Sequence, residues 1–551
     1  MGRFLPHIGI IAILGFALIV RIPAIFYGLP LHLYADEEVN IYSALKMLQL
    51  KTFLPVLHPE AFSILYEPPV LSYLYALFFI PTALVLLVLH STSSFAVLAD
   101  LILLDPSVFF VVGRIVTIAL SLGSIYLLYQ IGNILFTSTR AALFSALFLA
   151  TSFFHTTLAV TARHWEISTF LSLLSLFFVL LHTKHPEWRW LLPASGAALG
   201  LSFGAGYLVF YAPCIGLLIL YYQWQKVHSY ALSHYVRPSL LFGAPFTIIA
   251  TLSVVVAPDP FYKQVLTHVY ADRHTVLEFI VFYTQSLMRY ETLLAIGTLI
   301  GFGALLRDRA WNLLFFIGLF LATMLPIIFV FLWDLDRYLH PLLPILALIA
   351  GYGAYALTRL KSHITPLLIG VILVYASAVF IRLDTLMLRN DTRTLAYAWA
   401  EEHIPAGSTV LVDSERMRFR TTPAAVEILE TIDPGAVRAP DRVTRENGSP
   451  VFNAFNVHLL RKKDTAAVIE AAQTLGSKVY VVTDSWSDTT AIHQLVNNTS
   501  PIRIFSSKST RPTPHGLYIG GEEHYENRAH VLKLLWSAQL LGPEVLIYTI
   551  N

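Results

Sequence analysis

The sequence has few charged residues. Only 13% of its 551 residues are charged, whereas 56% are hydrophobic, and the mean hydropathy is +0.64. A soluble domain does not reach such values, because its surface must be polar. The composition therefore excludes a wholly soluble protein and predicts a protein that resides in a lipid bilayer.

Cysteine and clustered positive charge are also scarce. The single cysteine, Cys214, lies inside an apolar run, which excludes a disulfide framework and a thiolate metal site. The net charge is +2, and the basic residues stand singly or in pairs between apolar runs. This pattern excludes a surface that follows the phosphates of a nucleic acid.

Long apolar stretches are abundant. The first follows Met-Gly-Arg, is long enough to cross a bilayer and has no small-residue cleavage site after it, so we expect an uncleaved membrane helix instead of a cleaved signal peptide. Stretches of similar or nearly similar length occur at about 7–27, 69–90, 108–135, 141–160, 167–182, 190–205, 207–223, 239–257, 291–306, 311–332, 338–357 and 364–382.

The stretch at 69–90 decides the topology. If it lies along the outer face without crossing, every strongly basic loop falls on the cytoplasmic side, as the positive-inside rule requires. These loops hold Arg140, Lys184 with Arg189, Lys226 with Arg237, Arg307 with Arg309, and Arg359 with Lys361. We therefore expect about eleven transmembrane helices and a juxtamembrane or re-entrant element that begins at Pro68-Pro69.

With this topology, nearly all acids of residues 1–384 gather on the outer face. They are Asp36, Glu37, Glu38, Glu60, Glu67, Asp100, Asp105, Glu166, Asp259, Asp272, Glu278, Asp334 and Asp336. From residue 385 to 551 charged residues become frequent and no run can span a membrane. Amphipathic patterns at Thr392–His403 and Thr465–Leu475 alternate with β-branched runs at Thr409–Val412 and Lys478–Val482, which predicts a soluble extracytoplasmic α/β domain.

Three acidic motifs on the outer face are candidates for chemistry. Asp36-Glu37-Glu38 follows the first helix with few cations nearby, and such a cluster suits a general base, although a solvated rim has the same composition. Glu67 precedes two prolines, where it either faces a pocket or favours a helix N-terminus. Glu166 shares a short turn with Arg163, and the two residues either serve a site or pair with each other.

Arginine and histidine add two further possibilities. Arg337 lies in Asp334-Leu335-Asp336-Arg337, where it either snorkels to the interface or clamps a lipid phosphate. The loop 258–290 holds histidines beside acids, which permits a divalent metal, but their spacing is not diagnostic and we assign no metal site. Its charged residues and histidines include Lys263, His268, Asp272, Arg273 and His274.

The distribution of charge favours one function class. A transporter needs polar groups near the bilayer midplane and helices interrupted in repeated halves, neither of which the sequence has. The spans are apolar in their middles and charge is confined to one surface, which favours chemistry at an interface. A scaffold or lipid-binding protein would also leave the midplane apolar, but it would not require acids in three separate outer loops.

The ordered set of motifs resembles glycosyltransferase family 39, a group with the GT-C fold. The resemblance covers residues 1–384 and rests on Asp36-Glu37, Glu67-Pro68-Pro69, Arg114, Arg163 to Glu166, and Arg337-Tyr338 with Leu342-Leu343-Pro344. This family includes the protein O-mannosyltransferases and the lipid A aminoarabinose transferases.

The resemblance implies an inverting membrane glycosyltransferase that takes a sugar from a polyprenyl-phosphate donor on the outer side of the membrane. The alternative is a non-catalytic membrane protein that binds or presents a polyprenyl-linked glycan. It implies that Asp36 is the catalytic base, with Glu37 in the same pocket, and we expect Arg163 and Arg337 to bind the donor phosphate and Glu67 and Glu166 to be further pocket acids. The acceptor is a protein, a lipid or a polysaccharide, and a prokaryotic inner membrane is the simplest location. Some relatives bind a metal, and none is assigned here.

Overall fold

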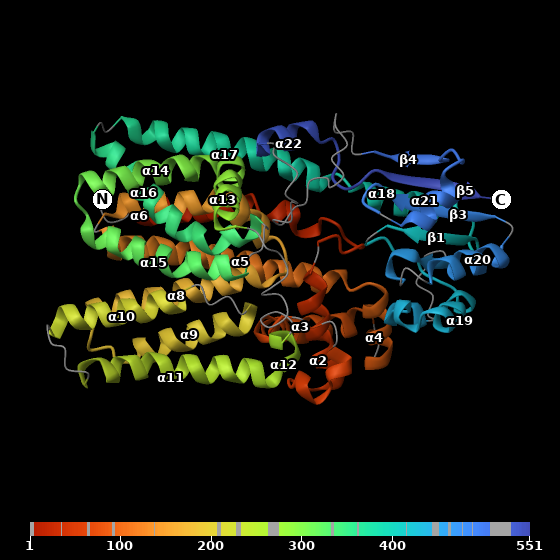
Figure 1. Ribbon diagram of the computed structural model, residues 1–551, viewed down its shortest axis with the longest axis horizontal. Coiled ribbons are helices and arrows are strands. Elements are labelled where there is room, and N and C mark those ends of the chain that lie inside the picture. Colours follow the sequence, from red (N-terminus) through yellow and green to blue (C-terminus); the bar gives the residue numbers. More distant parts are fainter. Residues whose placement is uncertain are drawn as a thin grey trace.

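The computed structural model consists of a bundle of long helices and a smaller domain with a β-sheet at one end of it (Figure 1). It describes residues 5–550 except 35, 63–64, 66, 91–93, 137, 207–210, 228–232, 263–274, 332–335, 361–362, 415, 444–450, 461–463, 477, 488 and 507–529. Residues 263–274 of the candidate loop and the residues Asp334 and Leu335 therefore lie outside the described residues.

The bundle is helical because a chain in lipid must satisfy its backbone hydrogen bonds internally. Its helices are α1 (Leu5–Ile19), α2 (Glu37–Leu50), α3 (Val70–Leu89), α4 (Phe95–Leu104), α5 (Ser107–Phe136), α6 (Thr139–Ala150), α7 (Phe153–Ala159), α8 (His164–Lys184), α9 (Leu191–Gly206), α10 (Ala212–Val227), α11 (Ser233–Val256), α12 (Pro258–Phe261), α13 (Val276–Tyr290), α14 (Thr292–Arg307), α15 (Trp311–Phe331), α16 (Leu343–Leu360) and α17 (Ile364–Leu388). A short 3-10 helix, η5 (Asp336–Leu342), leads into α16.

Within the described residues, seven helices are long and apolar enough to cross a membrane, and two bent pairs raise this number to nine. The expected span at 190–205 corresponds to the shorter apolar helix α9. The expected span at 311–332 corresponds to α15, which is counted as an apolar helix over Trp311–Ala322. The chain is an integral membrane protein, as its composition predicts, while the count of eleven spans stays a prediction.

Glycines allow two helix pairs to pack closely. A Cβ atom on Gly301 of α14 would lie 1.9 Å from the carbonyl oxygen of Ile349 in α16, and one on Gly196 of α9 would lie 2.0 Å from that of Phe242 in α11. Small residues at such crossings let helix backbones approach, which is the usual basis of helix packing in membranes.

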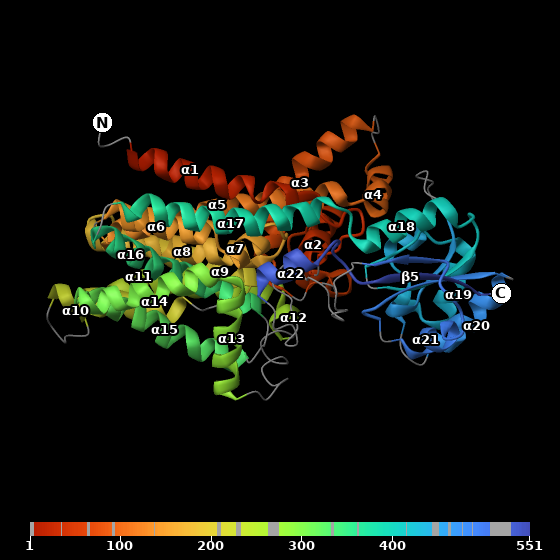
Figure 2. The same ribbon diagram turned by 90° about the horizontal axis from the view of Figure 1, so that it is seen from above.

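Helices α2, α3 and α4 lie at the end of the bundle that faces the sheet (Figure 1). Val70–Leu89 is long and apolar enough to span, but in Figure 2 the axis of α3 diverges from the parallel helices α5, α6 and α17. The C-terminal ends of α10, α14 and α16, which carry Lys226, Arg307 and Arg359, lie at the opposite end (Figure 1). This arrangement supports the expected separation of acidic and basic loops.

The C-terminal part combines helices with a five-stranded sheet, which confirms the predicted α/β fold. Its order is β2-β1-β3-β5-β4, with β1 parallel to β2 and β3, and β5 antiparallel to β3 and β4. The strands are β1 (Thr409–Asp413), β2 (Asn453–Asn456), β3 (Val479–Asp484), β4 (Arg503–Phe505) and β5 (Val545–Ile550). Helix α18 (Thr392–His403) packs on one face, and α19 (Pro423–Ile432), α20 (Thr465–Leu475) and α21 (Thr490–Val496) pack on the other.

The last helix of this part returns to the bundle. Helix α22 (Val531–Ser537) packs against α17, and Arg382 of α17 donates a hydrogen bond to the carbonyl oxygen of Leu535 at 3.0 Å. Helix α17 itself continues to Leu388, past the predicted domain boundary between residues 384 and 385. The α/β domain is thus joined to the bundle by more than one segment.

Candidate active site

Asp36 stands at the start of α2. Its φ of 64° is left-handed, a conformation that aspartate tolerates better than most side chains. Its Oδ2 atom accepts a hydrogen bond from Nη2 of Arg163 at 2.5 Å, and its side chain is 27% exposed, whereas that of Arg163 is only 3% exposed. The structure thus joins an accessible carboxylate to a buried cation from a loop 127 residues away.

Glu37, the next residue, is completely buried. Nε and Nη2 of Arg114 donate to its two carboxylate oxygens at 2.9 and 2.7 Å, and the amide of Ala162 donates at 2.8 Å. Arg114 also donates to the carbonyl oxygens of Ile25 and Tyr27. Glu37 therefore connects α2 and α5 to the turn that carries Arg163, and it does not share the exposed side of Asp36.

Glu67 lies in a second buried group. Its Oε2 atom accepts a hydrogen bond from Nδ2 of Asn40 at 2.5 Å, and its Oε1 atom lies 2.8 Å from Nδ1 of His164. Asn40 belongs to α2 and His164 directly follows Arg163. Glu67 therefore supports the two segments that carry Asp36 and Arg163.

Glu166 is buried farther along α8. Its Oε1 atom lies 2.7 Å from Nε2 of His340, and its Oε2 atom lies 3.5 Å from Nε2 of His155. The turn from Arg163 to Glu166 thus points its two charged side chains to different partners, Asp36 and His340.

Arg337 lies in η5 and is half-buried. The ring of the next residue, Tyr338, packs edge-on against Trp165 of α8 with centroids 5.3 Å apart. The structure therefore brings η5 and the start of α8, which carry the two candidate phosphate-binding arginines, next to each other.

The segment before Asp36 has a distinct electrostatic environment. Burial, reinforced by the charge of Arg114, lowers the pKa of His32 to about 4. Burial raises the pKa of the neighbouring Tyr34 above its ordinary value of 10, and Arg114 lies 4.7 Å from the centre of the Tyr34 ring. Both side chains are therefore neutral at pH 7, and the charges next to the site are those of the acids and arginines.

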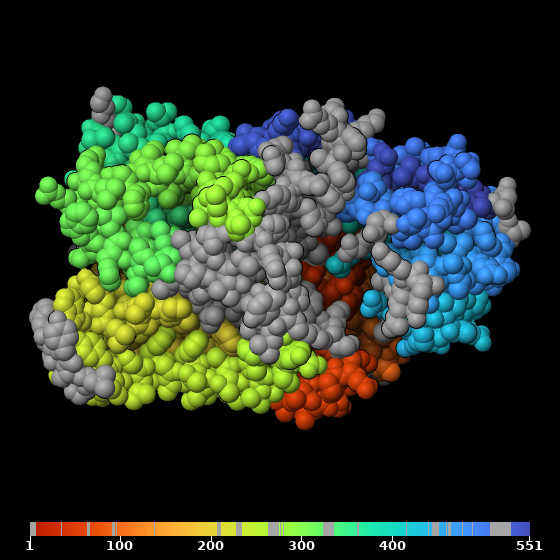
Figure 3. All heavy atoms as spheres, in the orientation of Figure 1, coloured from red at the N-terminus to blue at the C-terminus, as the bar shows by residue number. Residues whose placement is uncertain are grey.

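The site lies where the bundle meets the α/β domain. Figure 3 shows a hollow between the two parts, with atoms of the red N-terminal segment at its floor. Nη1 of Arg416, which follows β1, lies 2.9 Å from Oε1 of Glu38. The α/β domain therefore contacts the acidic cluster directly.

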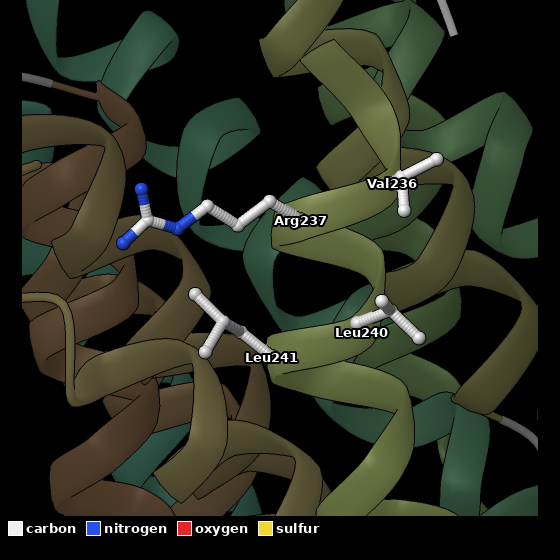
Figure 4. Close-up of a pocket in the computed structure, with 4 residues that line it drawn as sticks. All are labelled: Val236, Arg237, Leu240 and Leu241. Atoms are coloured by element: carbon white, nitrogen blue, oxygen red, sulfur yellow. The ribbon is translucent and has the colours of Figure 1, made fainter. Parts of the chain in front are cut away.

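A separate groove lies far from this region. It is lined by Val236, Arg237, Leu240 and Leu241 near the start of α11, where the Arg237 side chain extends sideways from the helix (Figure 4). That part of α11 is at the end of the bundle away from the sheet (Figure 1). The groove has the composition of a lipid-facing surface with one snorkelling arginine.

Sequence reasoning missed the histidines. His164, His155 and His340 each contact a candidate acid, but the sequence spacing of these residues matches no metal or catalytic motif. Ligand atoms of His155, Glu166 and His340 lie within 4.8 Å of one another, which would suit a divalent metal ion. Their hydrogen bonds favour another role.

Comparison with known proteins bears on the region that contains Arg163. Residues 107–258 match a mannosyltransferase family model. Its description is dolichyl-phosphate-mannose-protein mannosyltransferase, and the matched segment includes Arg114, Arg163 and Glu166. This match confirms the predicted family resemblance over that segment, while Asp36, Glu67 and Arg337 lie outside it.

Two solved structures are similar at low identity. The oligosaccharyltransferase of Archaeoglobus fulgidus in the apo form is 12% identical, with 88% of this chain and 70% of that chain covered and a TM-score of 0.48. ArnT from Cupriavidus metallidurans bound to undecaprenyl phosphate is also 12% identical, with 90% and 96% covered and a TM-score of 0.47. A search of curated protein sequences finds no match.

Proposed function

We propose that the chain is an inverting membrane glycosyltransferase that moves a sugar from a polyprenyl-phosphate-linked donor to an acceptor hydroxyl on the outer face of the membrane. The observation that carries the proposal is the pairing of the accessible Asp36 with Arg163, since Arg163 lies in the segment that matches the mannosyltransferase family. The family's description names a dolichyl-phosphate-linked donor, which supports a polyprenyl phosphate as leaving group.

In the proposed reaction Asp36 is the general base. Its carboxylate takes the proton of the acceptor hydroxyl while the hydroxyl oxygen forms a bond to the anomeric carbon. The bond between that carbon and the phosphate oxygen breaks on the opposite side, which inverts the anomeric configuration. The electron pair leaves with the polyprenyl phosphate, whose developing charge Arg163 and Arg337 stabilise.

The other acids have supporting roles in this proposal. Glu37 and Glu67 hold the segments that carry Asp36 and Arg163, because their carboxylates are occupied by Arg114, Asn40 and His164. The acceptor hydroxyl belongs to a protein, a lipid or a polysaccharide, and the membrane is the inner membrane of a prokaryote. The enclosing hollow between bundle and α/β domain is the proposed acceptor route (Figure 3).

The test is sugar transfer by the purified full-length chain in lipid nanodiscs. With polyprenyl-phosphate mannose as donor probe and a serine-containing peptide as acceptor probe, we expect mannosylated peptide and polyprenyl phosphate as products. We expect Asp36→Asn to lower the rate about 100-fold or more, the usual contribution of a general base. Donor binding should persist in this variant. Glu60→Gln, an exposed acid on the same side of the bundle, is the matched control and should retain the rate.

Two outcomes would contradict the proposal in different ways. Donor binding without turnover of any polyprenyl-phosphate hexose would favour the non-catalytic binding protein. Turnover that Asp36→Asn leaves unchanged would retain the enzyme but remove Asp36 as its base.

A further inference from the structure

A chain of buried polar side chains runs through the bundle beneath the candidate site. Glu166 lies 2.7 Å from Nε2 of His340, whose Nδ1 lies 3.1 Å from the hydroxyl of Thr169. On the other side, Nη2 of Arg21 lies 3.0 Å from Nδ1 of His155, whose Nε2 faces Glu166 at 3.5 Å. Arg21, His155, Glu166 and His340 have no exposed surface.

The positions of the protons follow from the partners. The guanidinium of Arg21 can only donate, so Nδ1 of His155 accepts and the neutral ring carries its proton on Nε2. The short contact between Nε2 of His340 and a carboxylate oxygen places a proton there too. Both ring protons therefore lie on the side of Glu166, but only that of His340 makes a hydrogen bond, since Nε2 of His155 and Oε2 of Glu166 have no hydrogen-bond partner among the described residues.

This arrangement disfavours a metal ion at the cluster. A histidine nitrogen that carries a proton has no lone pair for a metal, and here both nitrogens that face Glu166 carry one. Glu166 and His340 thus form a buried hydrogen-bonded pair, which His155 faces without a hydrogen bond, although the spacing of the three side chains would permit a metal.

This pair connects the two elements that hold the candidate phosphate-binding arginines. Arg163 precedes α8 and stands three residues before Glu166, and Arg337 stands three residues before His340 within η5. Residues three apart in a 3-10 helix lie on the same side. The bond from Glu166 to His340 therefore spans the same two elements as Arg163 and Arg337.

We infer that Glu166 and His340 are positioning residues that set the separation of Arg163 and Arg337 and so control the affinity for the donor phosphate. This inference rests on the proposed function. Because neither residue has exposed surface, each acts through the arginine that its own element carries. A small displacement of one element would misalign the two guanidinium groups relative to the phosphate.

The test measures binding of a polyprenyl phosphate and of the corresponding polyprenol, which lacks the phosphate. We expect His340→Ala to raise the Kd for the phosphate about tenfold or more and to leave the Kd for the polyprenol unchanged. His340→Gln should restore most of the affinity, because its amide N–H can still donate to Glu166. Ser175→Ala is the control and should change neither Kd. Ser175 lies farther along α8, and this variant removes its buried hydrogen bond to Ser195 of α9.

Each result decides a different question. If the wild type binds the phosphate no better than the polyprenol, the proposed function fails, and this inference fails with it. If the wild type prefers the phosphate and His340→Ala binds it equally well, only the positioning role is wrong. If His340→Ala does not fold, Thr169→Val, which removes the other hydrogen-bond partner of His340, is measured instead. Separately, one equivalent of zinc bound to the purified wild type would overturn the assignment of protons.

Discussion

At the scale of single residues, Asp36 and Glu37 differ sharply although they are adjacent. Successive side chains at a helix start point about 100° apart, so Asp36 turns to Arg163 while Glu37 turns into the bundle to Arg114. Exposure follows the same division, 27% for Asp36 and none for Glu37. Asp36 therefore stays accessible, whereas Glu37 is held inside the bundle by its ion pair with Arg114.

The burial of Glu37 predicts a large effect on stability. Glu37→Ala would leave Arg114 buried without its carboxylate partner, which costs about 3–5 kcal/mol, and we expect a correspondingly lower unfolding midpoint of the purified protein. Glu430→Ala, which breaks the exposed pair with Arg442, is the control and should cost about 1 kcal/mol or less. Equal shifts in the two variants would show that the bidentate pair contributes no more than a surface pair.

At the scale of elements, two broken helices stabilise each other. Helices α13 and α14 bend by 112° at Glu291, and α6 and α7 bend by 60° before Phe153. Glu291 accepts hydrogen bonds from the hydroxyl of Ser152 at 2.6 Å and from the amide of Phe154 at 2.8 Å. Glu291, at the break between α13 and α14, thus accepts hydrogen bonds from the donors of Ser152 and Phe154. These donors lie at the break between α6 and α7, where the helix itself supplies no acceptor for them.

The orientation of α3 leads to a prediction of topology. If α3 does not cross the bilayer, Glu60 before it and Ser94 after it lie on the same side. Both positions are exposed, and the native Cys214 is buried. We expect Glu60→Cys and Ser94→Cys to react in intact cells with a membrane-impermeant thiol reagent, whereas Arg307→Cys, at the opposite end, should stay unlabelled. Labelling of only one of the first two variants would show that α3 crosses.

At the scale of the whole molecule, several contacts fasten the α/β domain to the bundle. The hydroxyl of Tyr27 donates to Asp391 at 2.7 Å, and Asp391 also pairs with Arg393 at the start of α18. Arg416 adds a contact with Glu38. These bonds hold the end of β1 over the segment that begins with Asp36, so the domain takes part in shaping access to the site.

The pair of Glu38 and Arg416 can be tested by exchange of charge. Glu38→Arg should lower the unfolding midpoint, because two cations would then face each other, and Arg416→Glu in the same chain should restore it. Both side chains are partly exposed, so the coupling energy should be about 1 kcal/mol or less. Arg442→Glu in the Glu38→Arg chain is the control and should restore nothing. A double variant no more stable than Glu38→Arg would show that the pair does not form.

Local pattern was enough to predict several elements. Helices α18 and α20 begin and end at the expected residues, and β1 and β3 differ from expectation by one or two residues at an end. These elements depend on the periodicity of a few neighbouring side chains, which any single sequence displays. The membrane location follows equally directly from composition.

Composition, periodicity and the placement of charge determine that this chain resides in a membrane, carries a C-terminal α/β domain and gathers acids at one end. Only the tertiary structure decides what each acid does. Glu37 meets Arg114 across 77 residues, Glu67 meets His164 across 97, and Glu166 meets His340 across 174. Helix packing determines these partners. The sequence alone does not distinguish a carboxylate that packing buries against a cation from one that packing leaves accessible.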